Sequence, residues 1–469
     1  MTHLTGHVHI IGAGGSGMSG IARVLLARGV QVSGSDAKQS RRLSALEPLG
    51  ANVYVGHDGQ KMLAQGQPDV VVVSTAIPDS NPEIVTAKEL GIPVLHRSAA
   101  LADLVAGYVG VSVSGCHGKT TTTSMMTVVL QYAGVDPSFV IGSEMNESGS
   151  NAHQGSGQHF VVEADESDGT FLALPTTAAI VTNIEPDHLN YWKTFEALEQ
   201  AYIDFMIQPQ QRDGLTVTCG DDPGVAKVLA KVKASGARII TYGTEVGNDA
   251  VVHLLPNQSA GCLFTIDYNG ETYGPIQLAV PGRHNALNAT AAFITAFELG
   301  IDVQKAIEGL QAYTGAHRRF EYRGESSGVR VFDDIAHHPT EVDAVLRAAR
   351  NVVGQGRVII AFQAHHYYRT EMFMDEFAQA LGLADFTLVL EIFAPGETPI
   401  PGISGVIMAS KVPLPAESVV FEPSWSAVPE LLAQQAQPGD IIMTLGGSDI
   451  GMMCPQIIDL LNQKFADVN

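Results

Sequence analysis

The sequence predicts an α/β protein of three domains, each built on a mainly parallel sheet. Its 469 residues exceed what one hydrophobic core holds, since a domain averages roughly 150 residues. Short apolar runs alternate with helix-like stretches, as in HVHIIGAGG followed by SGIARVLLARG, which is typical of strands joined by crossover helices. This pattern restarts near Gly110 and near Gly315, so we expect domains at 1–109, 110–313 and 314–469.

Composition narrows the class of protein. Acidic residues outnumber basic ones by 49 to 27, and the resulting charge of −22 disfavours a nucleic-acid partner. The longest weakly polar stretch, 99–113, is interrupted by Asp103 and is too short for a membrane span, so we expect no membrane insertion. The opening MTHLTGHVHI lacks a signal-peptide pattern, and the four cysteines show no metal-binding or disulfide spacing. We therefore expect a cytoplasmic protein.

The first domain opens with a glycine-rich turn, IGAGGSGMSG at 11–20, between a predicted strand and a predicted helix. Such a turn lets backbone N–H groups approach a phosphate, and Asp36 follows Gly14 at a spacing suited to a ribose hydroxyl. Tight-turn packing without a ligand is the alternative. A dinucleotide dehydrogenase would also need such a turn, but it would leave the chain's second glycine loop unexplained.

That second loop lies in VSVSGCHGKTTTT, residues 111–123, after an apolar strand and before an apolar helix. Its glycines allow the backbone to wrap around a phosphate. Lys119 would neutralise the β and γ charges, and the Thr120 hydroxyl is a hard oxygen ligand of the kind Mg²⁺ accepts. Val113 stands where the common, longer form of the loop has its first glycine.

Two further strands of the central domain end in acidic or imidazole groups. VVEADESD packs Glu163, Asp165, Glu166 and Asp168 into six residues, and TNIEPDH ends in Asp187 and His188. A solvated acidic turn and a structural histidine are the plainer interpretations. Because parallel strands place their carboxyl ends at one edge, these groups and the Thr120 hydroxyl could converge on Mg-ATP.

The rest of the central domain contains an expected antiparallel flap and a helix start. Alternating strands with an Asn-Gly turn at 267–271 predict the flap within 250–282. In GRHNALNA, Asn285 and Asn288 are three residues apart on one helix face, where their amides could bind an adenine edge. Helix capping, which needs no ligand, is the alternative.

The third domain collects histidines and arginines in HRRFE, DDIAHHPTE and FQAHHYYRT. A zinc site would need cysteines or an HExxH spacing, and these three segments contain neither. Histidines together with Arg369 suit a substrate carboxylate or phosphate instead.

Taken in order along the chain, these motifs resemble the Mur ligases of peptidoglycan synthesis, and the resemblance covers almost the whole sequence. It implies a Rossmann-like UDP-binding domain, a central P-loop ATPase domain and a Rossmann-like amino-acid domain. The implied reaction uses ATP to phosphorylate the lactyl carboxylate of UDP-N-acetylmuramate, and the amine of L-alanine then attacks the acyl phosphate. ATP and two Mg²⁺ ions are the implied cofactors, in a monomer or weak homodimer.

The resemblance also implies roles for individual residues. Catalysis would involve Lys119, His188, His337 and Arg369. The metal ligands would be Thr120, Glu163 and His188. ATP would be bound by Gly115, Cys116, His117, Gly118, Lys119, Thr120, Thr121, Asn285, Asn288, Arg319 and Asp334. Substrate binding would use Gly14, Ser16, Met18, Ser19, Asp36, Ser74, His337, His365 and Arg369.

Three residues depart from the family pattern. Cys116 replaces a threonine, and as a thiol beside phosphates it would be open to oxidation. Ile335 and His366 replace an aromatic residue and an arginine at the expected amino-acid pocket. Two alternatives to the alanine-adding reaction therefore stay open: a recycling ligase that attaches a preformed tripeptide to the same sugar nucleotide, and a P-loop regulator that forms no bond.

Overall fold

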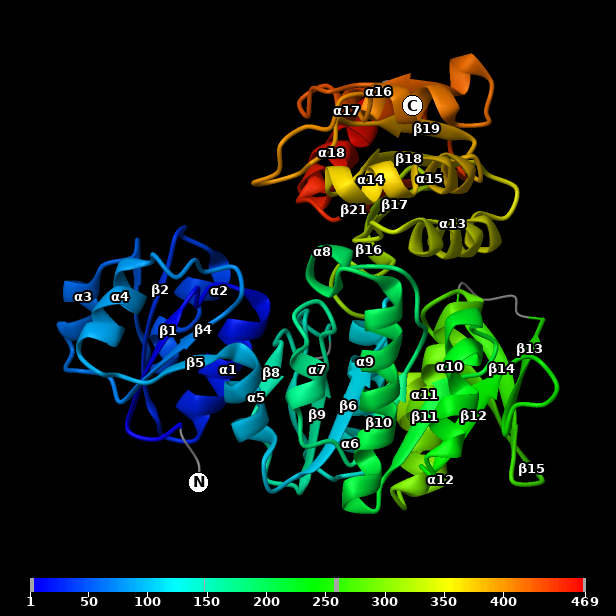
Figure 1. Ribbon diagram of the computed structural model, residues 1–469. Coiled ribbons are helices and arrows are strands. Elements are labelled where there is room, and N and C mark those ends of the chain that lie inside the picture. Colours follow the sequence, from blue (N-terminus) through cyan, green and yellow to red (C-terminus); the bar gives the residue numbers. More distant parts are fainter. Residues whose placement is uncertain (1–3, 147, 257–260, 467–469) are drawn as a thin grey trace. The chain divides into compact units, whose positions relative to one another are not determined.

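A computed structural model describes residues 4–146, 148–256 and 261–466 and shows the expected α/β architecture (Figure 1). The chain forms two compact units. The first runs to His253 and includes Phe264–Ile276 and Leu287–Tyr313; the second comprises Leu254–Leu263, Gln277–Ala286 and everything from Thr314 onward. The strands form three sheets. The N-terminal sheet lies in the first unit, the central sheet begins there, and the C-terminal sheet lies in the second unit.

The N-terminal sheet has the strand order β3-β2-β1-β4-β5, and its neighbouring strands are all parallel. Every connection is therefore a crossover, as the alternating sequence pattern predicts. Its strands are β1 (His7–Ile11), β2 (Gln31–Asp36), β3 (Asn52–Val55), β4 (Val70–Val73) and β5 (Val94–His96). Its helices are α1 (Ser16–Ala27), α2 (Arg41–Ser44), α3 (Gly59–Leu63), α4 (Pro82–Glu89) and α5 (Arg97–Val105).

The central sheet continues the first unit around a core of parallel strands in the order β12-β11-β10-β6-β9-β7, with β8 antiparallel at the edge. The strands are β6 (Val109–Ser114), β7 (Ser138–Val140), β8 (Ala152–His153), β9 (His159–Glu163), β10 (Ala178–Val181), β11 (Leu215–Cys219) and β12 (Ile239–Gly243). The helices are α6 (Lys119–Tyr132), α7 (Thr170–Ala173), α8 (Leu189–Trp192), α9 (Phe195–Ile207), α10 (Pro223–Ala234), α11 (Arg283–Glu298) and α12 (Val303–Ala312).

The expected flap joins this sheet and does not stand apart from it. β13 (Ala250–Leu255) pairs with β12 in parallel, and the order continues through β14 (Cys262–Tyr268) and β15 (Glu271–Leu278). Asn269 and Gly270, with φ of 51° and 81°, form the two-residue turn between β14 and β15. Positive φ at both positions is what a tight hairpin requires, so these two strands run antiparallel as the Asn-Gly signal predicts.

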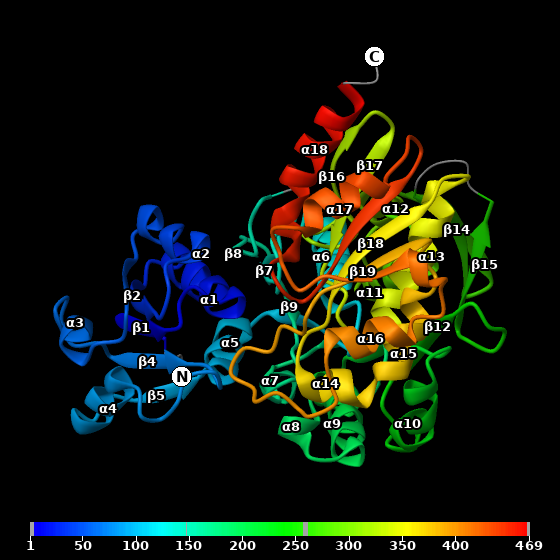
Figure 2. The ribbon, with the colours of Figure 1, turned by 90° about the horizontal axis from the view of Figure 1, so that it is seen from above.

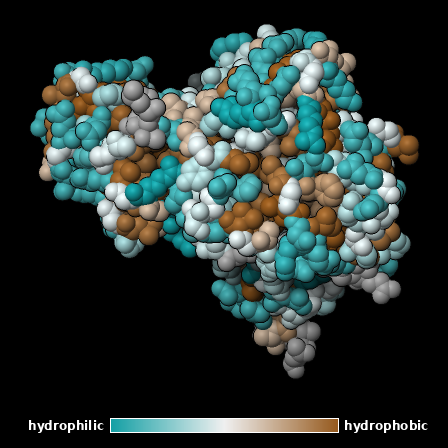
Figure 3. All heavy atoms as spheres, turned by 90° about the horizontal axis from the view of Figure 1, so that it is seen from below, coloured by the Kyte–Doolittle hydropathy of each residue, from teal (hydrophilic) through white to brown (hydrophobic). Residues whose placement is uncertain are grey.

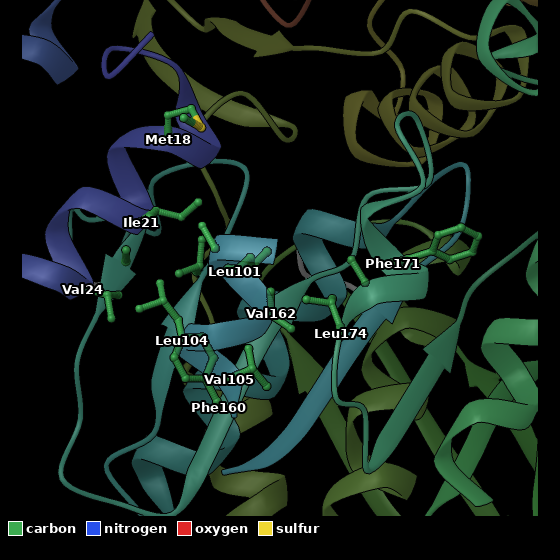
Figure 4. Close-up of a cluster of buried hydrophobic side chains, with 14 of the residues drawn as sticks. Met18, Ile21, Val24, Leu101, Leu104, Val105, Phe160, Val162, Phe171 and Leu174 are labelled. Carbon is green, nitrogen blue, oxygen red and sulfur yellow. The ribbon is translucent and has the colours of Figure 1, made fainter. Parts of the chain in front are cut away.

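One hydrophobic core joins the N-terminal sheet's helices to the central sheet within the first unit (Figure 4). Met18, Ile21 and Val24 of α1 and Leu101, Leu104 and Val105 of α5 belong to the same buried cluster as Phe160 and Val162 of β9. At Gly20 the packing is so close that an added Cβ would lie 2.9 Å from Val140. The helix that follows the glycine turn is therefore packed against the central sheet through one shared hydrophobic core.

The C-terminal sheet of the second unit has the order β16-β17-β21-β18-β19-β20, with only β16 antiparallel to its neighbour in this part of the described chain. Its strands are β16 (Glu321–Ser326), β17 (Val329–Asp334), β18 (Val358–Gln363), β19 (Phe386–Val389), β20 (Val419–Phe421) and β21 (Ile441–Gly446). Separate cores cover its two faces, with α13 (Pro339–Val353), α15 (Met374–Leu381) and α16 (Gly405–Lys411) on one and α17 (Val428–Gln435) and α18 (Cys454–Ala466) on the other (Figure 2).

The surface mixes polar and apolar side chains, as the face in Figure 3 illustrates. Large exposed apolar side chains such as Val246, Tyr322 and Met452 come from widely separated parts of the chain. None of the helices in the described residues is long and apolar enough to span a membrane.

Candidate functional site

The predicted phosphate loop, residues 115–121, consists of the turn 115–118 between β6 and α6 and the first three residues of α6. Gly115 and Gly118 have φ of 133° and 81°, which side chains other than hydrogen rarely allow. A Cβ at Gly115 would overlap the Thr182 hydroxyl, and one at Gly118 would lie 2.8 Å from Asn288 Oδ1. These glycines are therefore needed both for the turn and for its close packing. The first N–H groups of α6 then face the loop, as in an anion-binding turn.

The loop is fastened to the segment that follows β10. Asn183 accepts from the His117 amide at 2.9 Å and donates to the His117 carbonyl at 3.0 Å. The Cys116 sulfur accepts from the Glu185 amide at 3.1 Å and lies 3.2 Å from the Glu185 carbonyl. Burial raises the pKa of this thiol well above its usual value. The Cys116 side chain is thus buried and ties the loop to the Glu185 backbone. Because a buried thiol with a raised pKa reacts slowly, the expected sensitivity to oxidation is disfavoured.

Lys119, the first residue of α6, forms a buried ion pair with Glu166 at 2.9 Å. It also donates to the Gly115 carbonyl at 2.7 Å, which folds its side chain back over the loop. Desolvation opposes its charge, but the carboxylates of Glu166 and Asp165 raise the pKa of Lys119 above the usual value. Burial raises the pKa of Glu166, whose side chain is 0% exposed. Lys119 therefore keeps its positive charge at the place where phosphates would lie.

Thr120 and Glu163 place a hydroxyl and a carboxylate close together near this lysine. The Thr120 hydroxyl lies 3.1 and 3.0 Å from the two Glu163 carboxylate oxygens, and the Gly142 amide donates to Glu163 Oε2 at 2.7 Å. A hydroxyl and a carboxylate at the end of a phosphate loop are the donors that Mg²⁺ takes together with nucleotide phosphates. The residues present thus fit a magnesium ion.

His188 lies on the other side of Glu166. Its Nε2 is 3.6 Å from Glu166 Oε1 and 3.6 Å from Asp187 Oδ2, and its backbone has a positive φ of 52°. The Trp192 indole donates to the Glu166 carbonyl at 2.9 Å. The structure therefore brings together the predicted Lys119, Thr120, Glu163 and His188. It adds Glu166, which links Lys119 to His188.

The two asparagines of α11 have different surroundings. Asn288 is buried against Gly118 of the phosphate loop. Asn285 donates to the Pro281 carbonyl at 2.7 Å, a bond local to the start of the helix. Asn285 thus makes a local bond to the backbone that precedes the helix, while Asn288 lies directly at the loop.

A cavity of about 340 Å³ opens at the glycine turn of the N-terminal sheet. Four of the residues predicted to bind substrate line it, namely Ser16, Met18, Asp36 and Ser74. Asp36 also accepts from the Gly14 amide at 2.9 Å, so it helps to shape the turn. Ser19 is buried and donates to the Ser16 carbonyl at 3.0 Å, which directs its hydroxyl along its own helix.

Two polar side chains that line the cavity, those of His57 and Arg97, were not predicted from the sequence. His57 Nδ1 lies 2.9 Å from the Ser35 hydroxyl and 3.4 Å from Glu83, which is fully buried. Arg97, the first residue of α5, donates to Asp168 at 2.6 Å and to Asp165 at 3.1 Å. No local motif marks either residue, because both are isolated in the sequence.

In the second unit, Asp334 ends β17 and accepts from the amides of Phe320 and Ala336, each at 2.7 Å. Its burial raises the pKa of this carboxyl to about 6, against the lowering effect of Arg319. Arg319 itself pairs with Glu341 at 3.4 Å. The predicted Arg319 and Asp334 therefore belong to one charged group at the carboxyl end of the sheet.

A histidine cluster, formed by His337, His365 and His366, lies close by in the same unit. The rings of His337 and His365 are 6.0 Å apart, and those of His365 and His366 are 3.9 Å apart. Burial, followed by the neighbouring histidines and Arg369, lowers the pKa of His365 to about 3. Arg369 is 2% exposed and lies 5.6 Å from the Tyr368 ring. A buried guanidinium can bind and orient a carboxylate, and a neutral imidazole beside it adds no charge to the pocket.

The two residues that depart from the pattern in this region have definite positions. His366 pairs with Glu397 at 2.6 Å and has a φ of 72°. The Ile335 carbonyl lies 2.8 Å from His337 Nδ1, while the Ile335 side chain is partly exposed. His366 thus pairs with the Glu397 carboxylate. A histidine can therefore stand here in place of the family's arginine and still give Glu397 a partner.

Comparisons with known proteins cover the three regions separately. The profile "Mur ligase family, catalytic domain" matches residues 7–109, "Mur ligase middle domain" matches 113–296, and "Mur ligase, glutamate ligase domain" matches 318–447.

Individual relatives extend over the full length. A "UDP-N-acetylmuramate--L-alanine ligase" from Acidothermus cellulolyticus is 51% identical, covering 98% of this chain and 96% of the relative. One from Saccharopolyspora erythraea is 49% identical, covering 98% and 94%. The crystal structure of a UDP-N-acetylmuramate-alanine ligase from Thermotoga maritima has a TM-score of 0.81 at 25% identity, covering 98% and 99%. A murein peptide ligase from Psychrobacter arcticus, with a TM-score of 0.69 at 23% identity and coverage of 97% and 98%, shares the fold.

Proposed function

This chain belongs to the Mur ligase family, and from that membership we propose that it joins L-alanine to UDP-N-acetylmuramate with cleavage of ATP. The observation that carries this function is the identity of about half the residues, over the full length, with ligases of that name. The lactyl carboxylate attacks the γ-phosphorus of ATP and ADP leaves. The amine of L-alanine then attacks the acyl carbon and phosphate leaves, because a phosphate is a far better leaving group than a carboxylate oxygen.

In the central site we assign Lys119 to the β and γ phosphates. Its charge, sustained by Glu166, would stabilise the negative charge that develops during phosphoryl transfer. Thr120 and Glu163 would hold one magnesium ion and His188 a second, and the metal would polarise the transferring phosphoryl group. Asn288, which lies against the loop, and Asn285 would bind the adenine, and Arg319 and Asp334 the rest of the nucleotide.

We assign the cavity at the glycine turn to the UDP part of the sugar nucleotide. Its lining by Ser16, Met18 and Arg97 combines a helix start with a cationic side chain, which suits a diphosphate. The strong negative charge of the whole chain would repel such a ligand, so these local groups must provide the attraction.

We assign the histidine cluster and Arg369 to the amino acid. Arg369 would bind the carboxylate of L-alanine, and the neutral His365 would lie beside it without adding a charge that repels the ammonium group.

The test is a turnover panel with the purified chain, Mg²⁺, ATP and UDP-N-acetylmuramate. L-Alanine, glycine, L-serine and the preformed tripeptide are offered in parallel, and ADP release and amide product are both measured. We expect stoichiometric ADP and amide with L-alanine. Preference for the tripeptide would identify the recycling ligase, and ADP release without amide would identify a P-loop regulator.

Three further points belong to the same proposal. We place domain boundaries at 109/110 and 313/314, and we expect a monomer or weak homodimer, which light scattering would determine. We also propose a cytoplasmic location, because the four cysteines are free and buried and the substrates are nucleotides.

A further inference from the structure

We propose that Arg97 is a positioning residue that couples occupancy of the cavity at the glycine turn to the acidic segment, residues 163–168, of the ATP site. This inference rests on the proposed function, because it takes the occupant of the cavity to be a nucleoside diphosphate sugar.

Arg97 belongs to both places at once. It lines the cavity, and a Cβ on Gly17 of the glycine turn would lie 3.3 Å from its Nη1. Its Nη2 is bonded instead to Asp168 at 2.6 Å and to Asp165 at 3.1 Å. The guanidinium therefore turns one nitrogen to the acidic segment and another to the glycine turn.

The fork still has bonding capacity. Arg97 Nε is buried and makes no hydrogen bond with any of the residues described in the structure. No hydrogen bond from Nη1 to another described residue is found either, so this nitrogen has donors left for a ligand. Nη1, the nitrogen nearest the glycine turn, could donate to a phosphate oxygen while Nη2 keeps its bonds to the carboxylates, since a guanidinium group presents several donors in a fixed plane.

The acidic segment carries the groups that matter at the ATP site. Within its six residues, Glu163 bonds Thr120 and Glu166 bonds Lys119. Asp168 is almost fully buried, and its other oxygen accepts from the Thr170 amide at 3.1 Å. Fixing Asp165 and Asp168 from the cavity side therefore restricts the backbone that positions Glu163 and Glu166.

The charges reinforce this link. Desolvation opposes the charge of Arg97, but Asp165 and Asp168 raise its pKa. In turn, Lys119 and Arg97 lower the pKa of Asp165 despite the opposing effect of burial. Asp165 thus interacts with the cations of both sites, and a phosphate that immobilises Arg97 also orders the surroundings of Lys119.

Positive coupling between the two ligands follows. Either ligand would order Arg97 and the acidic segment when it binds, so the ligand that binds second loses less conformational entropy. We expect the affinity for a methylene-bridged ATP analogue to rise about tenfold when UDP-N-acetylmuramate is bound, with the same factor in the reverse direction.

Binding measurements without turnover test this coupling. The dissociation constant of the analogue, with Mg²⁺, is measured by calorimetry with and without saturating UDP-N-acetylmuramate. Asp168→Asn should bind each ligand alone about as well as the wild type while its coupling factor falls to about one, because only the link is broken. Asp165→Asn, at a more exposed position, is expected to lose part of the coupling and serves if Asp168→Asn folds poorly.

Arg28→Lys is the matched control. Arg28 also connects the N-terminal sheet to the central one, through Gln154 at 2.7 Å, but it does not line the cavity or touch the acidic segment. Its coupling factor should equal that of the wild type. Absence of coupling in the wild type, or full coupling in both aspartate variants, would overturn the inference. The turnover panel decides the ligase activity separately.

Discussion

The phosphate loop and the histidine cluster use opposite electrostatics. At the loop, Lys119 and Glu166 form a buried ion pair, and Thr120 and Glu163 add further polar bonds. In the cluster, His365 is held neutral and Arg369 is buried against the Tyr368 ring. The first arrangement suits a fixed, highly charged ligand such as a phosphate chain. The second suits a small zwitterion, because a guanidinium can bind its carboxylate and a neutral imidazole does not repel its ammonium group.

The largest effect should come from removing the charge at the phosphate loop. Lys119→Met keeps most of the side-chain volume but removes the cation, and we expect kcat to fall by about 10³. Because Glu166 would lose its partner, some loss of thermal stability should accompany it. Steady-state kinetics and circular dichroism measure both effects. Lys231→Ala, at an exposed position on α10, is the control, and near-normal kcat in Lys119→Met would break the comparison.

Two carboxylates of the acidic segment, those of Glu163 and Glu166, should affect different kinetic parameters. Glu163→Gln is expected to raise the Mg²⁺ concentration for half-maximal rate about tenfold, because it weakens an oxygen ligand. Glu166→Gln should lower kcat about tenfold with little change in that concentration, because it acts on Lys119. Magnesium titrations of the initial rate separate the two variants. Equal Mg²⁺ requirements would show that the structure assigns their partners wrongly.

At the histidine cluster, Arg369→Lys should act on the amino acid alone. A lysine keeps the charge but loses the planar fork, so we expect KM for L-alanine to rise about tenfold. KM for UDP-N-acetylmuramate should stay within about twofold, since nothing at the glycine turn changes. The exposed Arg347, paired with Asp343 on α13, provides Arg347→Lys as a control. A rise confined to KM for the sugar nucleotide would contradict the assignment.

The smallest effect concerns pH. His365 has a folded pKa of about 3, below the value of 6.5 for the unfolded chain, so its contribution to stability is complete above pH 6.5 and is lost as pH falls below it. The loss is on the order of 1 kcal/mol per pH unit. His365→Asn should therefore lose less stability than the wild type between pH 6.5 and 4.5.

The stability contribution of Asp334 changes with pH in the opposite direction, so the variant must be compared with the wild type. Asp334, with a folded pKa of about 6, contributes stability that is present at low pH and is lost as pH rises toward 6. Only the difference between His365→Asn and the wild type isolates the histidine. Thermal unfolding at several pH values measures it, and parallel curves would mean that His365 titrates normally.

Local motifs account for what the sequence could predict. The sheets follow from alternating apolar runs, and the hairpin follows from the Asn269-Gly270 turn. Gly115, Gly118, Lys119 and Thr120 are consecutive or nearly so, which means that one loop conformation fixes them all. Glu163 followed from its place at the end of a strand parallel to β6.

Groups selected by tertiary packing could not be predicted in this way. Glu166 is one of four acidic residues in a short stretch, and only the fold decides that it meets Lys119. Arg97 and His57 reach the cavity from helices and loops with no motif around them. The burial of Cys116 depends on Glu185, which lies 69 residues away in the sequence.

The threonine row of α6 has a consequence for dynamics. Thr123 donates to the Lys119 carbonyl at 2.7 Å, and Thr127 donates to the Thr123 carbonyl at 2.8 Å, so these hydroxyls are satisfied within the helix. Residues 120–130 are buried throughout, and these bonds within the helix offset the cost of burying Thr123 and Thr127, whereas the Thr122 hydroxyl is buried without a hydrogen-bond partner among the described residues. Their amides should be among the slowest in the protein to exchange with deuterium, because exchange requires the central sheet to open. The helix whose first turn we propose to bind the nucleotide would then keep its hydrogen bonds intact through each catalytic cycle.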